Sequence, residues 1–255
     1  MKKTSFLLVL AATASTMLFQ SCGGNSQTKA DMQNPSSDNT EAISASMKDN
    51  GEDNEMKSDD NSTTKAGAKD FAALNIENMQ AAFKGETTAS AKYAAYSKKA
   101  EEDGFLEIAL LFKAASTSEN IHANNHKAVL MDGGQKVPEI KPEFTVSTTS
   151  ENLKDAIKGE GYEISTMYPE FITTANSAGN QLSLISLNYA YKTEKKHKPL
   201  YEKALAAIEN NTVKSLAKVF YICPTCGNTY DTSAPKRCGI SMTSSEKFIK
   251  IDKLS

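Results

Sequence analysis

The stretch Ala82-Phe83-Lys84-Gly85-Glu86 has a counterpart 74 residues later, in Ala156-Ile157-Lys158-Gly159-Glu160. A second pair keeps nearly the same spacing, because Glu119-Asn120-Ile121-His122 is matched 75 residues later by Glu194-Lys195-Lys196-His197. Apolar residues recur around these motifs at three- to five-residue steps, which is typical of amphipathic helices. The repeat therefore predicts two helical hairpins, each with Gly-Glu on its first helix and E-x-x-H on its second.

Four long helices are expected, at about 70–102, 104–132, 150–178 and 180–211. At roughly 1.5 Å per residue, each of them would be more than 40 Å long. This length is typical of a four-helix bundle rather than of a compact mixed fold.

The E-x-x-H motifs place potential metal ligands on one helix face, because residues three apart are neighbours on a helix. The surrounding Ala, Leu, Ile and Phe residues must face a core, where unpaired carboxylates are strongly disfavoured. One Glu from each of two helices, with E-x-x-H from each of the other two, is the ligand set of a di-iron or di-manganese centre. The alternative, surface residues placed by chance, leaves the repeat unexplained.

Three further residues lie near these motifs. His126, one turn beyond the first E-x-x-H, is interpreted as a solvated residue or one that contacts a ligand, rather than as a ligand. Tyr93 follows Glu86 by seven residues, and Tyr168 follows Glu160 by eight. Both tyrosines can reach the metal neighbourhood, although periodicity alone favours ordinary core aromatics with satisfied hydroxyls.

Three cysteines, Cys223, Cys226 and Cys238, gather near the C-terminus in residues 218–255. A module of this size is too small to fold on its apolar core alone, and a metal knuckle is the usual remedy. A tetrahedral site takes four ligands, and the position expected for the fourth holds Ser241. The set is consistent with one iron or zinc ion, with a disulfide between Cys223 and Cys226 as the alternative outside the cytoplasm.

Residues 1–22 have the layout of a secretory signal, with Lys2 and Lys3 before an apolar run. Cys22, followed by two glycines, resembles the lipidated residue of a bacterial lipobox, so we expect an exported, lipid-anchored protein facing the periplasm or the cell surface. The alternative is cleavage after Ala14, which would leave Cys22 as a free thiol. Residues 23–69 are rich in polar and charged residues and are expected to form a disordered tether.

Composition excludes two classes of protein. The net charge of −2 and the pI near 6.0 leave no cationic surplus for a phosphate backbone, so nucleic-acid binding is not expected. The apolar run of the signal is shorter than the roughly 20 residues that a spanning helix needs. Membrane contact is therefore expected only through the lipid anchor.

From about residue 70 to 255, these motifs resemble rubrerythrin, a ferritin-like di-iron bundle followed by a rubredoxin-like domain. The resemblance implies a mainly α fold, with the bundle at 70–211 and the small β domain at 218–255. It also implies that Glu163, one turn after Glu160, is an additional iron ligand, and that Tyr93 and Tyr168 contact the ligands. The full implied set of bundle ligands is Glu86, Glu119, His122, Glu160, Glu163, Glu194 and His197.

The activity implied by the resemblance is reduction of hydrogen peroxide to water by a diferrous centre, in defence against oxidative stress. One iron would move between Glu163 and His122 as the redox state changes. A rubredoxin-like iron, here at Cys223, Cys226 and Cys238 with Ser241, would relay electrons inward, often across a head-to-tail homodimer.

Two departures from the family pattern leave alternatives open. Ser241 replaces the usual fourth cysteine, and export separates the protein from cytoplasmic pyridine nucleotides, so the electron donor is unknown. A non-enzymatic iron-binding or iron-buffering lipoprotein is one alternative. An oxidase that uses dioxygen is another.

Overall fold

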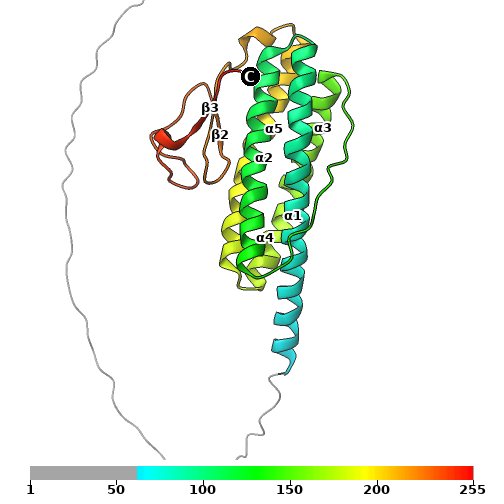
Figure 1. The fold of residues 1–255 in the computed structure, drawn as a ribbon, viewed down its shortest axis with the longest axis vertical. Helices are drawn as coiled ribbons and strands as arrows, with labels where there is room; N and C mark the ends of the chain where they lie inside the picture. Colours follow the sequence, from blue (N-terminus) through cyan, green and yellow to red (C-terminus); the bar gives the residue numbers. More distant parts are fainter. Residues whose placement is uncertain (1–61, 255) are drawn as a thin grey trace, which may run out of the picture. The chain divides into compact units, whose positions relative to one another are not determined.

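The structure is a computed structural model that describes residues 62–254, with side chains from residue 71 onward. Its helices form a bundle, and a small sheet follows them near the C-terminus (Figure 1). The predicted signal, Cys22 and most of the expected tether lie outside the described residues. Among the helices of the described part, none is both long enough and apolar enough to cross a bilayer.

The bundle is made of two helical hairpins, as the repeat predicts. The first pairs α1 with α2, and an extended segment at 133–148 then leads to the second (Figure 1). In chain order the elements are α1 (Ser62–Glu102), α2 (Leu106–Asp132), α3 (Thr149–Tyr162), a π-helix (Glu163–Met167), α4 (Tyr168–Ser177) and α5 (Gln181–Glu209). The predicted fold class, a ferritin-like four-helix bundle followed by a small β domain, is confirmed.

Helix α1 begins at Ser62, so the end of the predicted tether, residues 62–69, is helical instead. The prediction was wrong there because it required an apolar stripe. Extending an existing helix needs no new nucleus, so a polar segment can continue it.

Local sequence sets the start of the second hairpin. The Thr148 side chain accepts a hydrogen bond from the Glu151 backbone N–H, while the Glu151 carboxylate accepts one from the Thr148 N–H, which forms a capping box. Asn180 caps α5 by accepting from the Ser183 N–H.

The third predicted helix is interrupted by the π-helix. Pro169 lies at the first turn of α4, immediately after this wider turn, where a missing backbone N–H is tolerated. This position explains how a proline fits within a nearly continuous helix. π-segments of this kind are frequent at functional sites.

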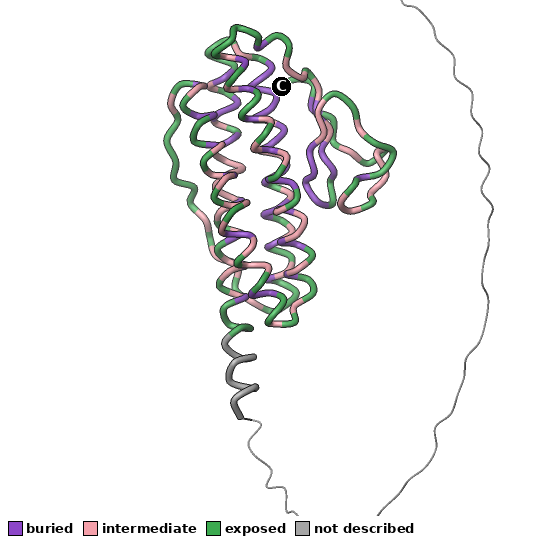
Figure 2. The backbone as a smooth tube through the Cα atoms, turned by 180° about the vertical axis from the view of Figure 1, so that it is seen from behind, coloured by how far each residue is buried: buried purple, intermediate pink, exposed green. Residues whose placement is uncertain are grey.

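Two apolar clusters fill the bundle. Along α1, α2 and α5, the predicted ligands lie between residues of one cluster and residues of the other, and Glu160 holds the corresponding place at the end of α3. One cluster contains Tyr93, Phe112 and Tyr201, and the other contains Met79 and Leu187. Figure 2 shows that the buried residues follow the inward faces of the helices. The fold therefore places a layer of acids and histidines in the middle of an apolar core.

The C-terminal domain contains a three-stranded antiparallel sheet in the order β2-β1-β3. Its strands are β1 (Phe220–Ile222), β2 (Thr229–Asp231) and β3 (Ile249–Ile251). The cysteine loop between β1 and β2 lies against α2, where Thr225 accepts a hydrogen bond from Asn125 and Gly227 accepts one from Ser118. It also lies against α5, where Thr193 donates a hydrogen bond to the Cys226 carbonyl. The domain thus lies beside the layer of ligands.

Candidate metal centre

Six of the predicted ligands converge in the bundle core. They form two overlapping groups, within each of which the potential ligand atoms lie within 4.8 Å of one another. Glu119 and Glu194 belong to both groups. The first group is Glu86, Glu119, His122 and Glu194, and the second is Glu119, Glu160, Glu194 and His197.

The two shared carboxylates each face both histidines. His122 Nδ1 lies 2.9 Å from one oxygen of Glu119 and 2.9 Å from one oxygen of Glu194. His197 Nδ1 lies 3.0 Å and 2.8 Å from the other oxygens of the same two carboxylates. Each carboxylate therefore offers one oxygen to each of two neighbouring positions, which is the geometry of a bridging ligand.

The remaining two carboxylates each face one histidine, as terminal ligands would. Glu86 Oε1 lies 3.6 Å from His122 Nδ1, and Glu160 Oε1 lies 3.9 Å from His197 Nδ1. Each of two neighbouring metal positions could thus be held by one histidine, one carboxylate of its own and the two shared carboxylates.

Hydrogen bonds from the C-terminal domain orient both imidazoles. His122 Nε2 lies 3.1 Å from the carbonyl oxygen of Cys226, and His197 Nε2 lies 3.0 Å from Thr229 Oγ1. Because the carbonyl can only accept, His122 Nε2 carries a proton and donates it. Such outer partners fix the ring that presents its other nitrogen to a metal.

The inner donor atoms fit a pair of metal ions. Both oxygens of Glu119 and Glu194, one oxygen of Glu160 and the Nδ1 atoms of both histidines are buried without a hydrogen-bond partner. Lone pairs at this separation repel one another unless a cation or proton lies between them. Four carboxylates match the charge of two divalent ions, and oxygen donors with two imidazoles suit iron or manganese.

Burial and the neighbouring charges shift the pKa values of these side chains. Burial raises the pKa of Glu86 to about 7. Burial alone would lower the pKa of His197, but Glu119 and Glu194 raise it to about 10. Burial would likewise raise the pKa of Glu194, yet the two facing histidines hold it below its usual range.

Metal binding is therefore expected to release protons, because a ligand must lose its proton to coordinate. At both pH 8 and pH 6.5, protons come from the histidines and from Glu160, whose pKa burial and the neighbouring carboxylates raise well above its usual range. At pH 6.5, below the Glu86 pKa of about 7, that carboxyl adds a further fraction, so more protons are released at the lower pH. Calorimetric titration with Mn²⁺ in buffers of different ionisation heat measures this release. Equal release at both pH values would contradict the assignment of Glu86.

Glu163 lies outside both four-residue groups. It is the first residue of the π-helix and is partly exposed. Its pKa is raised by burial and by the negative charges of Glu86 and Glu194, so it lies within electrostatic reach of the centre. The structure thus groups His122, and not Glu163, with the bridging carboxylates.

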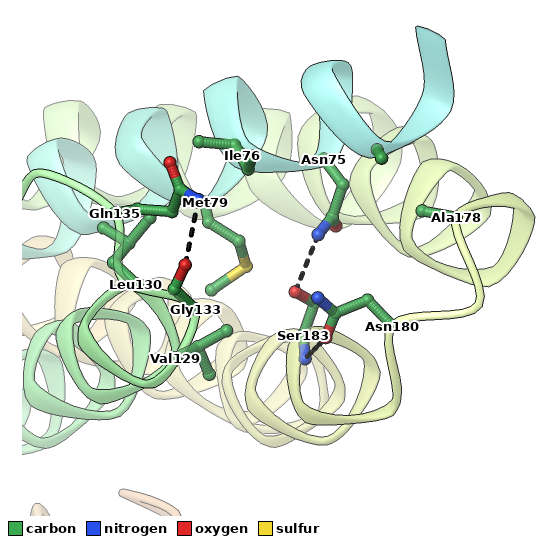
Figure 3. A pocket seen from close by; sticks show the side chains of 11 residues that line it. Asn75, Ile76, Met79, Val129, Leu130, Gly133, Gln135, Ala178, Asn180 and Ser183 are labelled. Atoms are coloured by element: carbon green, nitrogen blue, oxygen red, sulfur yellow. Dashed lines mark hydrogen bonds between the residues drawn. The ribbon is translucent and has the colours of Figure 1, made fainter. Parts of the chain in front are cut away.

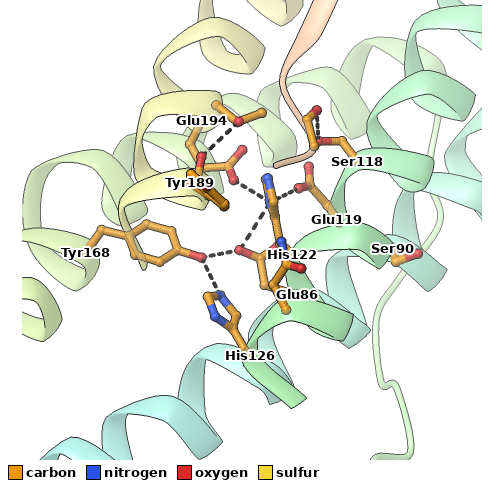
Figure 4. A network of polar contacts seen from close by, with 12 residues as sticks. Glu86, Ser90, Ser118, Glu119, His122, His126, Tyr168, Tyr189 and Glu194 are labelled. Carbon is orange, nitrogen blue, oxygen red and sulfur yellow. Dashed lines mark hydrogen bonds and ion pairs between the residues drawn. The ribbon is translucent and has the colours of Figure 1, made fainter. Parts of the chain in front are cut away.

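Both predicted tyrosines contact terminal carboxylates. Tyr93 donates a hydrogen bond of 2.8 Å to Glu160 Oε1. Tyr168 donates one to Glu86 Oε1, as Figure 4 shows. Each tyrosine is buried. Periodicity alone favoured ordinary core aromatics, but both hydroxyls also contact carboxylates of the centre.

Sequence reasoning missed four residues around the centre. Tyr201 is fully buried and its ring lies 5.5 Å from that of Tyr93; its spacing of four residues after His197 was an available signal. Ser118, Gly227 and Thr229 belong to the contact between the domains. That contact joins segments far apart in the chain, and no local pattern indicates it.

The C-terminal site brings the predicted cysteines together. Cys223, Cys226 and Cys238 are buried free thiols whose sulfur atoms lie within 4.8 Å of one another. Ser241 Oγ lies 3.2 Å from Cys223 Sγ, so the serine occupies the fourth place of the cluster. The Cys226 thiol and the Ser241 hydroxyl both contribute to lowering the pKa of Cys223, to about 4, which favours the metal-binding thiolate.

Comparison with known proteins identifies one family. The profile of the rubrerythrin family matches residues 77–205. Rubrerythrin-2 of Clostridium acetobutylicum is 33% identical over 69% of this chain and 96% of its own length. Nigerythrin of Nitratidesulfovibrio vulgaris is 34% identical over 72% of this chain and 89% of its own length. A solved structure of fully reduced, all-ferrous nigerythrin covers 69% of this chain and 86% of its own, with a TM-score of 0.62 and 32% identity.

Proposed function

Because the chain belongs to the rubrerythrin family, we propose that it is a di-iron oxidoreductase that reduces hydrogen peroxide to water in defence against oxidative stress. The observation that carries the proposal is the pair of bridging carboxylates, Glu119 and Glu194, each facing both His122 and His197. Such bridges hold two metal ions side by side. Two ferrous ions held there would supply the two electrons that cleavage of the peroxide bond consumes.

The protein contributes to the reaction by holding the ligands in place and by excluding bulk water. All six grouped ligands are at most 2% exposed. The hydroxyls of Tyr93 and Tyr168 fix the terminal carboxylates Glu160 and Glu86. Glu163, on the π-helix close to the centre, is the residue that we propose exchanges with His122 as the redox state changes.

Electrons are proposed to enter through the cysteine loop. The carbonyl of Cys226 contacts His122 Nε2, so one hydrogen bond connects a residue of the C-terminal cluster to a ligand of the bundle. This contact forms within one chain and does not depend on the homodimer, which stays a proposal. The reductant that supplies the C-terminal site is not identified by these contacts.

Ser241 is expected to lower the reduction potential of an iron in the C-terminal site, because a hard oxygen ligand stabilises the ferric state. The Ser241→Cys variant should therefore have a higher potential and more intense visible absorption from sulfur-to-iron charge transfer. Spectroelectrochemical titration of iron-loaded wild type and variant measures both. An unchanged potential would show that Ser241 is not a ligand.

The test of the proposed function is anaerobic mixing of the diferrous protein with hydrogen peroxide, following absorbance, peroxide loss and metal content. We expect fast oxidation and repeated turnover when an artificial reductant is added. Glu163→Ala should lower the rate far more than it lowers iron content. A single slow oxidation would favour iron buffering, whereas rapid oxidation by air with indifference to peroxide would favour a dioxygen-dependent oxidase.

We also propose, from the sequence alone, that lipidated Cys22 anchors the exported protein to a membrane facing the periplasm or the cell surface. A lipid chain confers membrane affinity that a serine cannot. Fractionation should find the wild type with membranes and the Cys22→Ser variant in the soluble fraction. Equal distribution of the two would overturn this assignment.

A further inference from the structure

The buried histidine outside the metal groups, His126, continues the hydrogen bonding of the centre into the second apolar cluster. Its Nε2 lies 3.4 Å from the hydroxyl of Tyr168, which in turn donates to Glu86 (Figure 4). Its Nδ1 lies 2.8 Å from Ser186 Oγ. His126 is fully buried, so its interpretation as a solvated residue was wrong. It is connected to the predicted ligand Glu86 through Tyr168.

The hydrogen bonds along this line have one direction. Burial lowers the pKa of His126 to about 3, so the ring is neutral, with one donor and one acceptor nitrogen. Because the Tyr168 proton is directed at Glu86, the Tyr168 oxygen accepts from His126 Nε2. Nδ1 is then the acceptor, and the Ser186 hydroxyl donates to it. Each donated proton points toward the metal centre.

Beyond Ser186, two further buried polar side chains contact each other. Ser183 lies one turn earlier on α5 and is fully buried, and it accepts a hydrogen bond of 2.9 Å from Asn75 Nδ2 on α1 (Figure 3). These residues lie beside apolar neighbours such as Met79 and Leu187, where apolar side chains would pack without a polar group to satisfy. Packing alone therefore does not explain why Ser186, Ser183 and Asn75 occupy these positions.

Asn75 and Ser183 lie at a pocket near one end of the bundle. The pocket has a volume of about 200 Å³, and Asn75, Asn180 and Ser183 are among the residues that line it (Figure 3). This volume admits several water molecules, since each occupies roughly 30 Å³ in the liquid. Asn75 is 2% exposed and its Oδ1 has no hydrogen-bond partner in the protein, so it is a ready acceptor for water in the pocket.

We propose that the polar line of Ser186, His126 and Tyr168 carries protons to Glu86 and the metal centre from water of this pocket, which reaches Ser186 past Ser183. The inference rests on the proposed function, in which H₂O₂, two protons and two electrons give two molecules of water. The two electrons would come from the ferrous pair that the six ligands would hold. The line supplies the protons: each group passes one proton on and receives another, so none of them changes its net charge.

The first test requires no turnover. In the protein loaded with redox-inactive Zn²⁺, ¹⁵N NMR should find His126 as the neutral tautomer with its proton on Nε2. Exchange of that proton with solvent should slow in Ser186→Ala, because the route to the pocket is cut. The Nδ1–H tautomer, or exchange unaffected by Ser186→Ala, would overturn the proposal.

The second test uses single-turnover oxidation of the diferrous protein by peroxide. His126→Gln keeps an amide that can hydrogen-bond to Tyr168 but cannot readily pass a proton. We expect His126→Gln and Ser186→Ala to slow oxidation about tenfold or more, with a larger solvent deuterium isotope effect and unchanged iron content. Ser97→Ala is the matched control, because Ser97 is a buried serine bonded to the Ala109 carbonyl, away from the line.

Different results would contradict the proposed function and the proposed proton route. If the wild type is not oxidised by peroxide, the proposed function is wrong. If the wild type is oxidised and both variants match Ser97→Ala in rate and isotope effect, the polar line does not carry protons. Slower oxidation without a change in isotope effect would show that His126 only positions Tyr168, and that outcome too would overturn the proposal.

Discussion

Replacing Glu194 with alanine is expected to abolish binding of both metal ions, because its two oxygens face the two metal positions separately. The loss of affinity should exceed the roughly 10–100-fold that removal of an outer hydrogen-bond partner causes. Peroxide-dependent activity should be lost with the metals. Iron analysis of the reconstituted variant should find fewer than one bundle iron per chain.

Glu160→Ala provides the matched control. Glu160 is also a buried carboxylate of the centre, but it belongs only to the group that contains His197. This variant should lose metal mainly from that position and keep the one beside His122. Equal metal loss in Glu160→Ala and Glu194→Ala would contradict the distinction between terminal and bridging ligands.

Gly227→Ala is expected to break the contact between the cysteine loop and the bundle. Gly227 has a φ of +75°, which alanine adopts only with strain. A Cβ there would lie 2.4 Å from His122 Nε2 and 2.8 Å from Ser118 Oγ. The strain and the overlap together should cost about 2–4 kcal/mol. The variant should bind metal at the cysteines but transfer electrons more slowly to the bundle.

Gly239→Ala separates this effect from a general disturbance of the C-terminal domain. A Cβ at Gly239 would make only an ordinary contact of 3.7 Å with the Tyr230 hydroxyl. Stopped-flow reduction of the bundle irons and thermal unfolding compare the two variants. If Gly227→Ala behaves like Gly239→Ala in both measurements, the contact at His122 does not contribute to electron entry.

The bundle and its ligands could be predicted because they follow helical rules. Residues three apart share a face, so each E-x-x-H motif places its two ligands together, and the repeat pairs the two halves. The start of α1 was predicted less well, because a polar extension carries no apolar stripe. The π-helix was not predicted either, although Pro169 marked the place where a regular helix had to change.

The surroundings of the centre depend on contacts between distant segments, and sequence patterns say little about those. The Cys226 carbonyl and Thr229 hydroxyl meet the two histidines through the packing of a loop on the bundle. His126 was misjudged for a related reason: its burial depends on partners from α4 and α5, and no single helix shows them. Glu163 was predicted as a ligand from the resemblance, and the structure places it outside both groups.

The central claim is that two irons, bridged by Glu119 and Glu194, react together with peroxide. Mössbauer spectroscopy of the ⁵⁷Fe-loaded protein, frozen before and after anaerobic addition of one equivalent of hydrogen peroxide, tests it most directly. We expect a ferrous pair to become an antiferromagnetically coupled diferric pair, while iron at the cysteines gives a separate signal. Isolated, uncoupled ferric ions, or a ferrous pair that peroxide leaves unchanged, would contradict it.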